Sequence, residues 1–212
     1  MTKKLIFLSL IIIISLLSYF VNWFNYVLIL ISVLALVYIL LIGLISIFKK
    51  VRSNHFKTPA LLICICITGV IISLFRPYDP AVIESENIST ELQYAYNTDQ
   101  DDRKELKSFV GYFSELNKRD SIRLMQVRKY YLENKITKPI DKFHAAFIFH
   151  HSDNSEDYKI ASELASEAAN SEKLKDNYTV RWLQKASYDR YMLSIGEPEK
   201  YNTQNNFSID FN

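Results

Sequence analysis

The chain begins with a long apolar stretch and changes to a mixed polar and apolar pattern after residue 76. Leu5–Phe48 is a run of 44 residues without a charge, and Asn22 and Asn25 mark a turn near its middle. Because roughly 20 apolar residues in a helix cross a bilayer core about 30 Å thick, this run is long enough for two spans. A third apolar run follows. We predict three transmembrane helices, at residues 5–21, 26–48 and 60–75.

Two of these spans have alternatives. The first has the basic start and apolar run of a signal peptide, but no small-residue cleavage site follows it before the second span. The third has only 16 residues, with Gly69 in its middle. An interfacial or re-entrant segment is the alternative there, and the polar half would then be cytoplasmic.

The polar half predicts a small helical domain. Its apolar residues recur every three or four positions and no run alternates with a period of two, which is typical of amphipathic helices. The predicted fold is therefore all-α, with a membrane anchor at 1–76, a linker at 77–90 and a helical bundle at 91–212. We predict five helices in the bundle, at 91–110, 113–134, 140–151, 155–170 and 178–195.

Charge is distributed unevenly between the two halves. Residues 1–76 contain seven basic residues and no acidic one, and since the chain has 25 basic residues, the other 136 residues carry 18 basic and 23 acidic. An acidic polar half excludes a basic nucleic-acid binder, and the predicted partner of the first half is the lipid bilayer. Basic residues cluster at 3–4 and 49–57, so the positive-inside rule predicts a cytoplasmic N-terminus and an extracytoplasmic C-terminal domain.

The sequence predicts neither a metal site nor a cofactor. Cys64 and Cys66 are the only cysteines and lie inside the third predicted span, where we interpret them as packing residues. Asp141, His144 and His151 could ligate a metal by residue type, but His144 and His151 are about 10 Å apart along a helix axis. We interpret His144 as a core residue and His150 as a solvated helix end.

Charged residues interrupt the apolar faces of the predicted helices. Asp120 and Arg190 each stand in an apolar stripe, and Asp99 and Arg103 are spaced for an ion pair one helical turn apart. His151 ends the most apolar helix. Because an unpaired buried charge is costly, these residues predict a shared polar cluster near one end of the bundle.

The order of these motifs resembles a family of uncharacterised bacterial domains, domain of unknown function 6624. The family's motifs correspond here to Asp99-Gln100-x-x-Arg103, Asp120, His150-His151, Asp189-Arg190 and Gly196-x-x-Glu199-x-Tyr201-Asn202-Thr203-Gln204. This chain departs from the pattern at His150, Glu199 and Asn202, where the family has Gln, Gln and Gly. The resemblance implies a fold and a candidate site but no activity.

Two interpretations of the cluster stay open. In the first, the domain is a binding, sensing or structural module, and the charges are ion pairs that fix the register of the helices. Its partner would be a protein or a small anionic ligand. The predicted binding residues are Asp99, Gln100, Arg103, Asp153, Arg190, Tyr201, Thr203 and Gln204.

In the second interpretation, the domain is a hydrolase or transferase that acts on an anionic substrate. His151 would be the general base, oriented by Asp120, Asp153 or Asp189. Arg103 or Arg190 would hold the anion, and the tail would close over the site. The structural interpretation makes a sharp prediction, since Arg190→Ala should then cost several kcal/mol by stranding a carboxylate.

Overall fold

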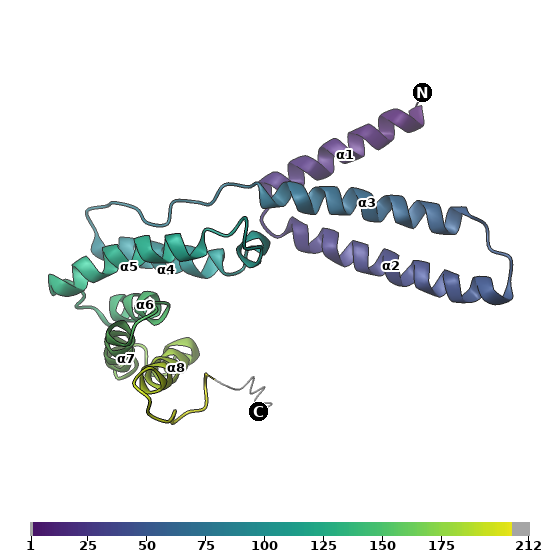
Figure 1. Cartoon of the computed structure of the whole chain (residues 1–212). Helices are drawn as coiled ribbons and strands as arrows, with labels where there is room; N and C mark the ends of the chain where they lie inside the picture. Colours follow the sequence, from purple (N-terminus) through teal and green to yellow (C-terminus); the bar gives the residue numbers. More distant parts are fainter. Residues whose placement is uncertain (1, 205–212) are drawn as a thin grey trace. The chain divides into compact units, whose positions relative to one another are not determined.

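The computed structural model describes residues 2–204, and within them the chain is helical without any β-strand (Figure 1). The chain folds into two compact units. The anchor unit contains the residues up to Pro77 together with Glu105–Ser114, and the helical unit contains Tyr78–Lys104 and the residues from Glu115 onward. The last part of the predicted tail, residues 205–212, lies outside the described residues.

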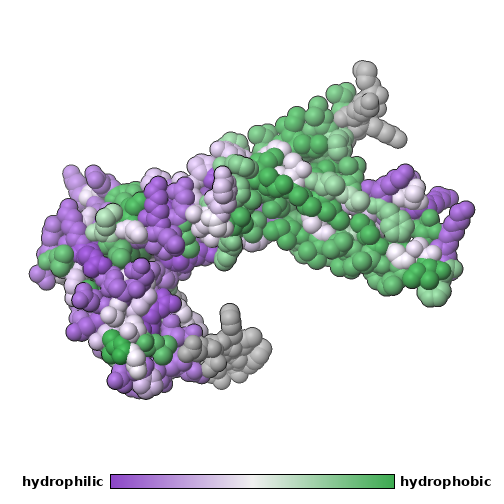
Figure 2. Space-filling view, viewed as in Figure 1, coloured by the Kyte–Doolittle hydropathy of each residue, from purple (hydrophilic) through white to green (hydrophobic). Residues whose placement is uncertain are grey.

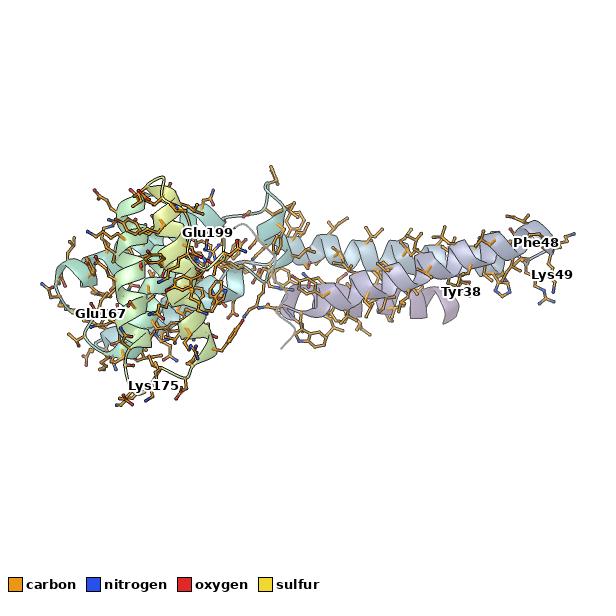
Figure 3. All side chains as sticks on the ribbon, turned by 90° about the horizontal axis from the view of Figure 1, so that it is seen from below. Tyr38, Phe48, Lys49, Glu167, Lys175 and Glu199 are labelled. Atoms are coloured by element: carbon orange, nitrogen blue, oxygen red, sulfur yellow. The ribbon has the colours of Figure 1, made fainter. Side chains whose placement is uncertain are left out.

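The anchor unit contains α1 (Thr2–Phe20), α2 (Phe24–Phe48), α3 (Asn54–Leu74) and the short 3-10 helix η1 (Leu106–Phe109). Hydrophobic residues cover the surface of the three long helices (Figure 2). Side chains of α2, among them Tyr38 and Phe48, project outward from the helix (Figure 3). A surface of this kind is the pattern expected of helices that contact lipid.

Two helices, and not the predicted three, are long and apolar enough to cross a membrane. They are α2 and α3. The prediction is wrong for the first span, because the apolar part of α1 among the described residues is limited to Phe7–Phe20. The third predicted span is longer than expected, since α3 begins at Asn54 and continues through Pro59. Pro59 is the sixth residue of α3 and has no backbone N–H, so the helix continues with one intrahelical hydrogen bond missing at this position.

The three long helices meet at Gly69. A Cβ atom at this position would lie 2.5 Å from Leu28 Cδ1 and 2.8 Å from Ser18 Oγ, so only glycine allows this approach. At the same end of the unit, the Arg76 guanidinium donates hydrogen bonds to the carbonyls of Ser18, Tyr19 and Val21, at 2.5, 2.9 and 2.9 Å. Carbonyl groups at a helix C-terminus lack intrahelical donors. At the end of α1, the Arg76 guanidinium supplies these donors.

The helical unit confirms the predicted bundle. Its helices are α4 (Ile88–Asp102), α5 (Leu116–Leu132), α6 (Pro139–His150), α7 (Ser155–Ala169) and α8 (Tyr178–Ser194). The apolar helix α6 lies at the centre, and every residue from Phe143 to His150 is buried. The side chains of Asn87, Asn154 and Asn177 accept hydrogen bonds from the first turns of α4, α7 and α8, which is the usual function of an N-cap residue.

The first helix of the bundle ends earlier than predicted. It stops at Asp102 and not at residue 110, because the Asp102 side chain turns into the interior and the chain then leaves for the anchor unit. There the buried Lys107 side chain donates to the carbonyl of Arg76 at 2.8 Å. The predicted helix at 91–110 therefore does not continue beyond this point, although the Asp99–Arg103 ion pair that it implied is present.

The segment predicted as a linker is hydrogen-bonded along much of its length. Residues 78–87 contain no helix, but their backbone carbonyls accept from side chains of α4 and α5. These contacts are Tyr94 to Pro80 (3.0 Å), Thr98 to Ala81 (3.1 Å), Gln126 to Ile83 (2.9 Å) and Arg119 to Asp79 (2.6 Å). This segment therefore covers the helices as an extended strap.

Candidate functional site

Two arginines of α5 form the buried part of the polar cluster. Arg119 Nε donates to Asp102 Oδ2 at 2.6 Å, and Arg123 pairs with the same carboxylate. Arg123 Nη1 also donates to Asp120 Oδ1 at 3.0 Å. The Arg123 side chain has no exposed surface, so its charge depends entirely on these partners.

The cluster continues through Arg103 to the residues predicted from the sequence. Arg103 Nη2 donates to Asp99 Oδ1 at 2.9 Å and to Asp120 Oδ2 at 2.8 Å. Gln100 Nε2 donates to Asp99 Oδ2 at 2.8 Å. The predicted convergence of Asp99, Arg103, Asp120 and His151 is therefore present, and Asp120 connects the two arginine groups.

The network is electrically balanced. With all its carboxyl groups ionised, its three positive and three negative charges cancel. A neutral network satisfies the main requirement for stable buried charge, which is that every ion has a partner. Its members are Arg103, Arg119, Arg123, Asp99, Asp102 and Asp120.

His151 lies at the edge of this network. Its Nδ1 atom is 3.1 Å from Asp99 Oδ1 and 3.0 Å from Arg103 Nε. One nitrogen cannot donate to the carboxylate and accept from the guanidinium at the same time, so the two contacts belong to different tautomers. When Nδ1 carries the proton and donates to Asp99, Nε2 is left as a proton acceptor.

The two carboxyl groups near His151 have pKa values displaced in opposite directions. Burial would raise the pKa of Asp99, but the His151 and Arg103 contacts outweigh it and hold that pKa well below its ordinary value. Burial raises the pKa of Asp120 above its ordinary value, and the neighbouring Asp99 adds to this increase while Arg103 opposes it. Opposed shifts of this kind occur at functional sites as well as in structural networks.

A cavity of about 240 Å³ opens beside His151. No arginine or lysine lines it within the described chain. Asp153 is exposed and makes no hydrogen bond or ion pair with any described residue. The lining residues are Asn117, Asp120, Ser121, Leu124, Ile148, His151, Ser152 and Asp153.

Asp189 does not reach His151 but fixes the C-terminal tail. Its buried carboxylate accepts hydrogen bonds from the backbone N–H groups of Lys200, Tyr201 and Thr203 at 2.8, 3.0 and 3.0 Å. The Thr203 hydroxyl adds a fourth at 2.8 Å. Burial would raise the pKa of Asp189, but these hydrogen bonds hold it below its ordinary value. The structure thus places Asp189 in a tail clamp, apart from the contacts of the polar network.

Arg190 also belongs to the tail and not to an ion pair. It donates to the His150 carbonyl at 2.6 Å and to Gln204 Oε1 at 3.1 Å, and its guanidinium lies over the Tyr158 ring. It forms no salt bridge with a carboxylate of the described residues. Burial lowers the pKa of Arg190, and the charge of Arg103 lowers it further.

Two histidines of α6 are buried without charge. His144 stacks on Tyr96, which agrees with its interpretation as a core residue. His150 was predicted to be solvated and is instead buried, because the Arg190 guanidinium and Trp182 cover the end of α6. Burial lowers the pKa of His144 to about 4 and that of His150 to about 2.

The sequence analysis missed Asp102, Arg119 and Arg123. Arg119, Arg123 and Val127 are spaced four residues apart and form the buried face of α5, whereas the sequence analysis considered only Asp120 among the charged residues of this helix. The spacing was visible in the sequence, but two arginines in a row of this kind are usually solvent-exposed. Their burial is favourable because Asp102 of α4 pairs with both arginines.

Within the described residues, no group of three or more His, Cys, Asp or Glu side chains is arranged to hold a metal ion. Comparisons of the chain with protein-family models, curated proteins and solved structures found no match. The resemblance to domain of unknown function 6624 therefore stays a prediction based on motif order.

Proposed function

We propose that the protein is a membrane-anchored binding module that holds a small polar ligand in the cavity beside His151. The observation that carries this proposal is the balance of charges around the cavity. The six charged residues of the network neutralise one another, so they serve as a rigid base. Asp153 and His151 are left to face the opening.

The lining of the cavity favours a ligand with an amino group over an anion. Asp153 offers an unpaired carboxylate, and Asn117, Ser121 and Ser152 offer neutral hydrogen-bonding groups. Without a lining arginine or lysine in the described chain, an anionic ligand would lack a direct counter-charge. This reverses the charge of the ligand expected from the sequence.

The binding module belongs on the extracytoplasmic side in this proposal. Support comes from α2 and α3, whose lengths suit a bilayer, and from the four basic residues between positions 49 and 57. If both helices cross, the residues after α3 emerge opposite that basic loop. This conclusion rests on α2 and α3 alone.

A hydrolase or transferase is the second candidate, and the hydrogen bond between Asp99 and His151 favours it. A buried carboxylate that holds an imidazole through Nδ1 leaves Nε2 free to accept a proton from water or from a substrate hydroxyl. Asp99, and not Asp120, Asp153 or Asp189, would then orient His151. Among the described residues, no arginine or lysine lines the cavity to stabilise developing negative charge, which makes this candidate the weaker one.

Calorimetric titration of the full-length protein in nanodiscs tests the proposal. Putrescine serves as the cationic probe and inorganic phosphate as the anionic probe. We expect putrescine to bind, and Asp153→Asn to weaken it by about tenfold, or 1.4 kcal/mol. Asp101→Asn is the matched control, because Asp101 is exposed and pairs only with Lys104 at the surface. Binding of phosphate instead, or binding of neither probe, contradicts the proposal.

A further inference from the structure

The segment 105–114 belongs to the anchor unit although it lies between two helices of the other unit. Lys107 Nζ donates to the Arg76 carbonyl at 2.8 Å and pairs with Glu105 at 2.9 Å. The Phe113 ring packs edge-on against Phe75, with 5.2 Å between centroids. These contacts fix the segment at the C-terminal end of α3.

Two aromatic side chains of this segment are exposed. Phe109 is 74% exposed and Tyr112 is 93% exposed. Residues 108–114 contain no charge, and the only two charges of the segment, Glu105 and Lys107, pair with each other. A segment without net charge that exposes aromatic rings is unfavourable in water but suits a lipid surface.

A second group of exposed aromatic residues lies at the same end of the anchor unit. Phe20 and Trp23 stand at the turn between α1 and α2 and are largely exposed. Arg76 connects the two groups, because its guanidinium binds carbonyls at the end of α1 and its own carbonyl accepts from Lys107. Trp and Tyr at one end of membrane-spanning helices are typical of the aromatic belt at the membrane interface.

We propose that segment 105–114 inserts Phe109 and Tyr112 into the headgroup region of the membrane that α2 and α3 span. The inference rests on the proposal that α2 and α3 span the membrane. It adds a second contact with lipid, which is made by residues about thirty positions after the end of α3. The occupant of this surface is the lipid bilayer itself, since the segment continues the apolar surface of the anchor unit.

Tryptophan quenching by brominated lipid tests this inference. The full-length protein, with Trp23→Phe and Trp182→Phe as background, receives either Tyr112→Trp or Tyr178→Trp and is reconstituted in phosphatidylcholine vesicles. Tyr178 is the matched control, because it is 81% exposed and belongs to the helical unit. We expect lipid brominated near the headgroups to reduce the fluorescence of Tyr112→Trp, with a blue-shifted emission, and to leave Tyr178→Trp unchanged.

A third protein separates the two proposals. The variant Trp182→Phe retains Trp23 as its only tryptophan and reports whether the anchor lies in the bilayer. Phe109→Trp, made in the same background as Tyr112→Trp, is a second probe of the segment. Quenching of Trp23 without quenching of Tyr112→Trp or Phe109→Trp would overturn the inference while the membrane anchor stands. Absence of quenching at all these positions would overturn both.

Discussion

Arg123 has no exposed surface and pairs with two carboxylates, Asp102 and Asp120. Arg190, which the sequence analysis singled out, donates only to a backbone carbonyl and an amide oxygen. The expectation that Arg190→Ala strands a carboxylate is therefore wrong. The cost of losing a buried charge depends on the charge of the partner that remains.

We expect Arg123→Ala to reduce the free energy of unfolding by about 3–5 kcal/mol, because it leaves the three carboxylates of the network with only two cations, Arg103 and Arg119. Arg190→Ala should cost only about 1–3 kcal/mol, the penalty of neutral acceptors without a donor. The exposed Arg181→Ala is the control and should change stability by less than about 0.5 kcal/mol. Urea unfolding of the full-length Trp23→Phe protein in micelles, followed by Trp182 fluorescence, measures all three. Equal losses for Arg123 and Arg190 would contradict this ranking.

Burial of His144 should make the folded protein less stable as the pH decreases. Its pKa is lowered by burial to about 4, whereas the unfolded chain takes up the proton near the ordinary value of 6.5. The unfolded state therefore binds more protons between these values, and its free energy falls as pH decreases. The contribution of His144 is complete above pH 6.5 and is lost towards pH 4, at up to about 1.4 kcal/mol per pH unit.

The variant His144→Phe keeps an aromatic ring against Tyr96 and removes the titrating group. Its unfolding free energy should vary less between pH 6.5 and 4 than that of the parent protein. Denaturant titrations at several pH values in this range measure the difference. Parallel curves for the two proteins would show that His144 does not titrate as its burial requires.

At the level of the elements, the sequence predicted α6, α7 and α8 almost to the residue. Their apolar periodicity is regular, and local signals mark their ends, such as Pro139 at the start of α6 and Gly196, whose φ of 82° suits glycine, after α8. These signals act within a few residues and are therefore readable from sequence.

Other elements were mispredicted because contacts distant in sequence define them. The end of α4 at Asp102 depends on Arg119 and Arg123, and the excursion at 105–114 depends on Arg76. The candidate site followed the same division. The sequence analysis identified Asp99, Arg103 and Asp120 as members of the polar cluster, because their positions on the helices are visible in the sequence. It did not identify all the residues with which they pair.

Gly69 provides a prediction at this scale. Gly69→Ala should weaken the packing of α1, α2 and α3, because the added Cβ would overlap Leu28 and Ser18, and small residues allow such close approach of helices in membranes. Gly43→Ala in α2 is the matched control, since a Cβ there meets no atom within 4 Å. Thermal unfolding of the two variants in micelles measures the effect. A melting temperature lowered only by Gly43→Ala would contradict the assignment.

For the whole molecule, the test of topology is a pair of alkaline phosphatase fusions, after Lys57 and after Asn212. This reporter is active only after export. We expect activity after Asn212 and none after Lys57, because the basic loop at 49–57 should stay in the cytoplasm. The reverse pattern would place the helical unit in the cytoplasm and contradict the proposed arrangement.

The chain passes between its two units three times, after Pro77, Lys104 and Ser114. A fragment cut after Pro77 would therefore carry ten residues whose packing partners have been removed with the anchor. Phe113 would lose its contact with Phe75, and with the already exposed Phe109 and Tyr112 it should make such a fragment aggregate for reasons unrelated to the fold of the bundle. A polar bridge in place of residues 105–114 is the way to isolate the five helices for crystallisation or NMR.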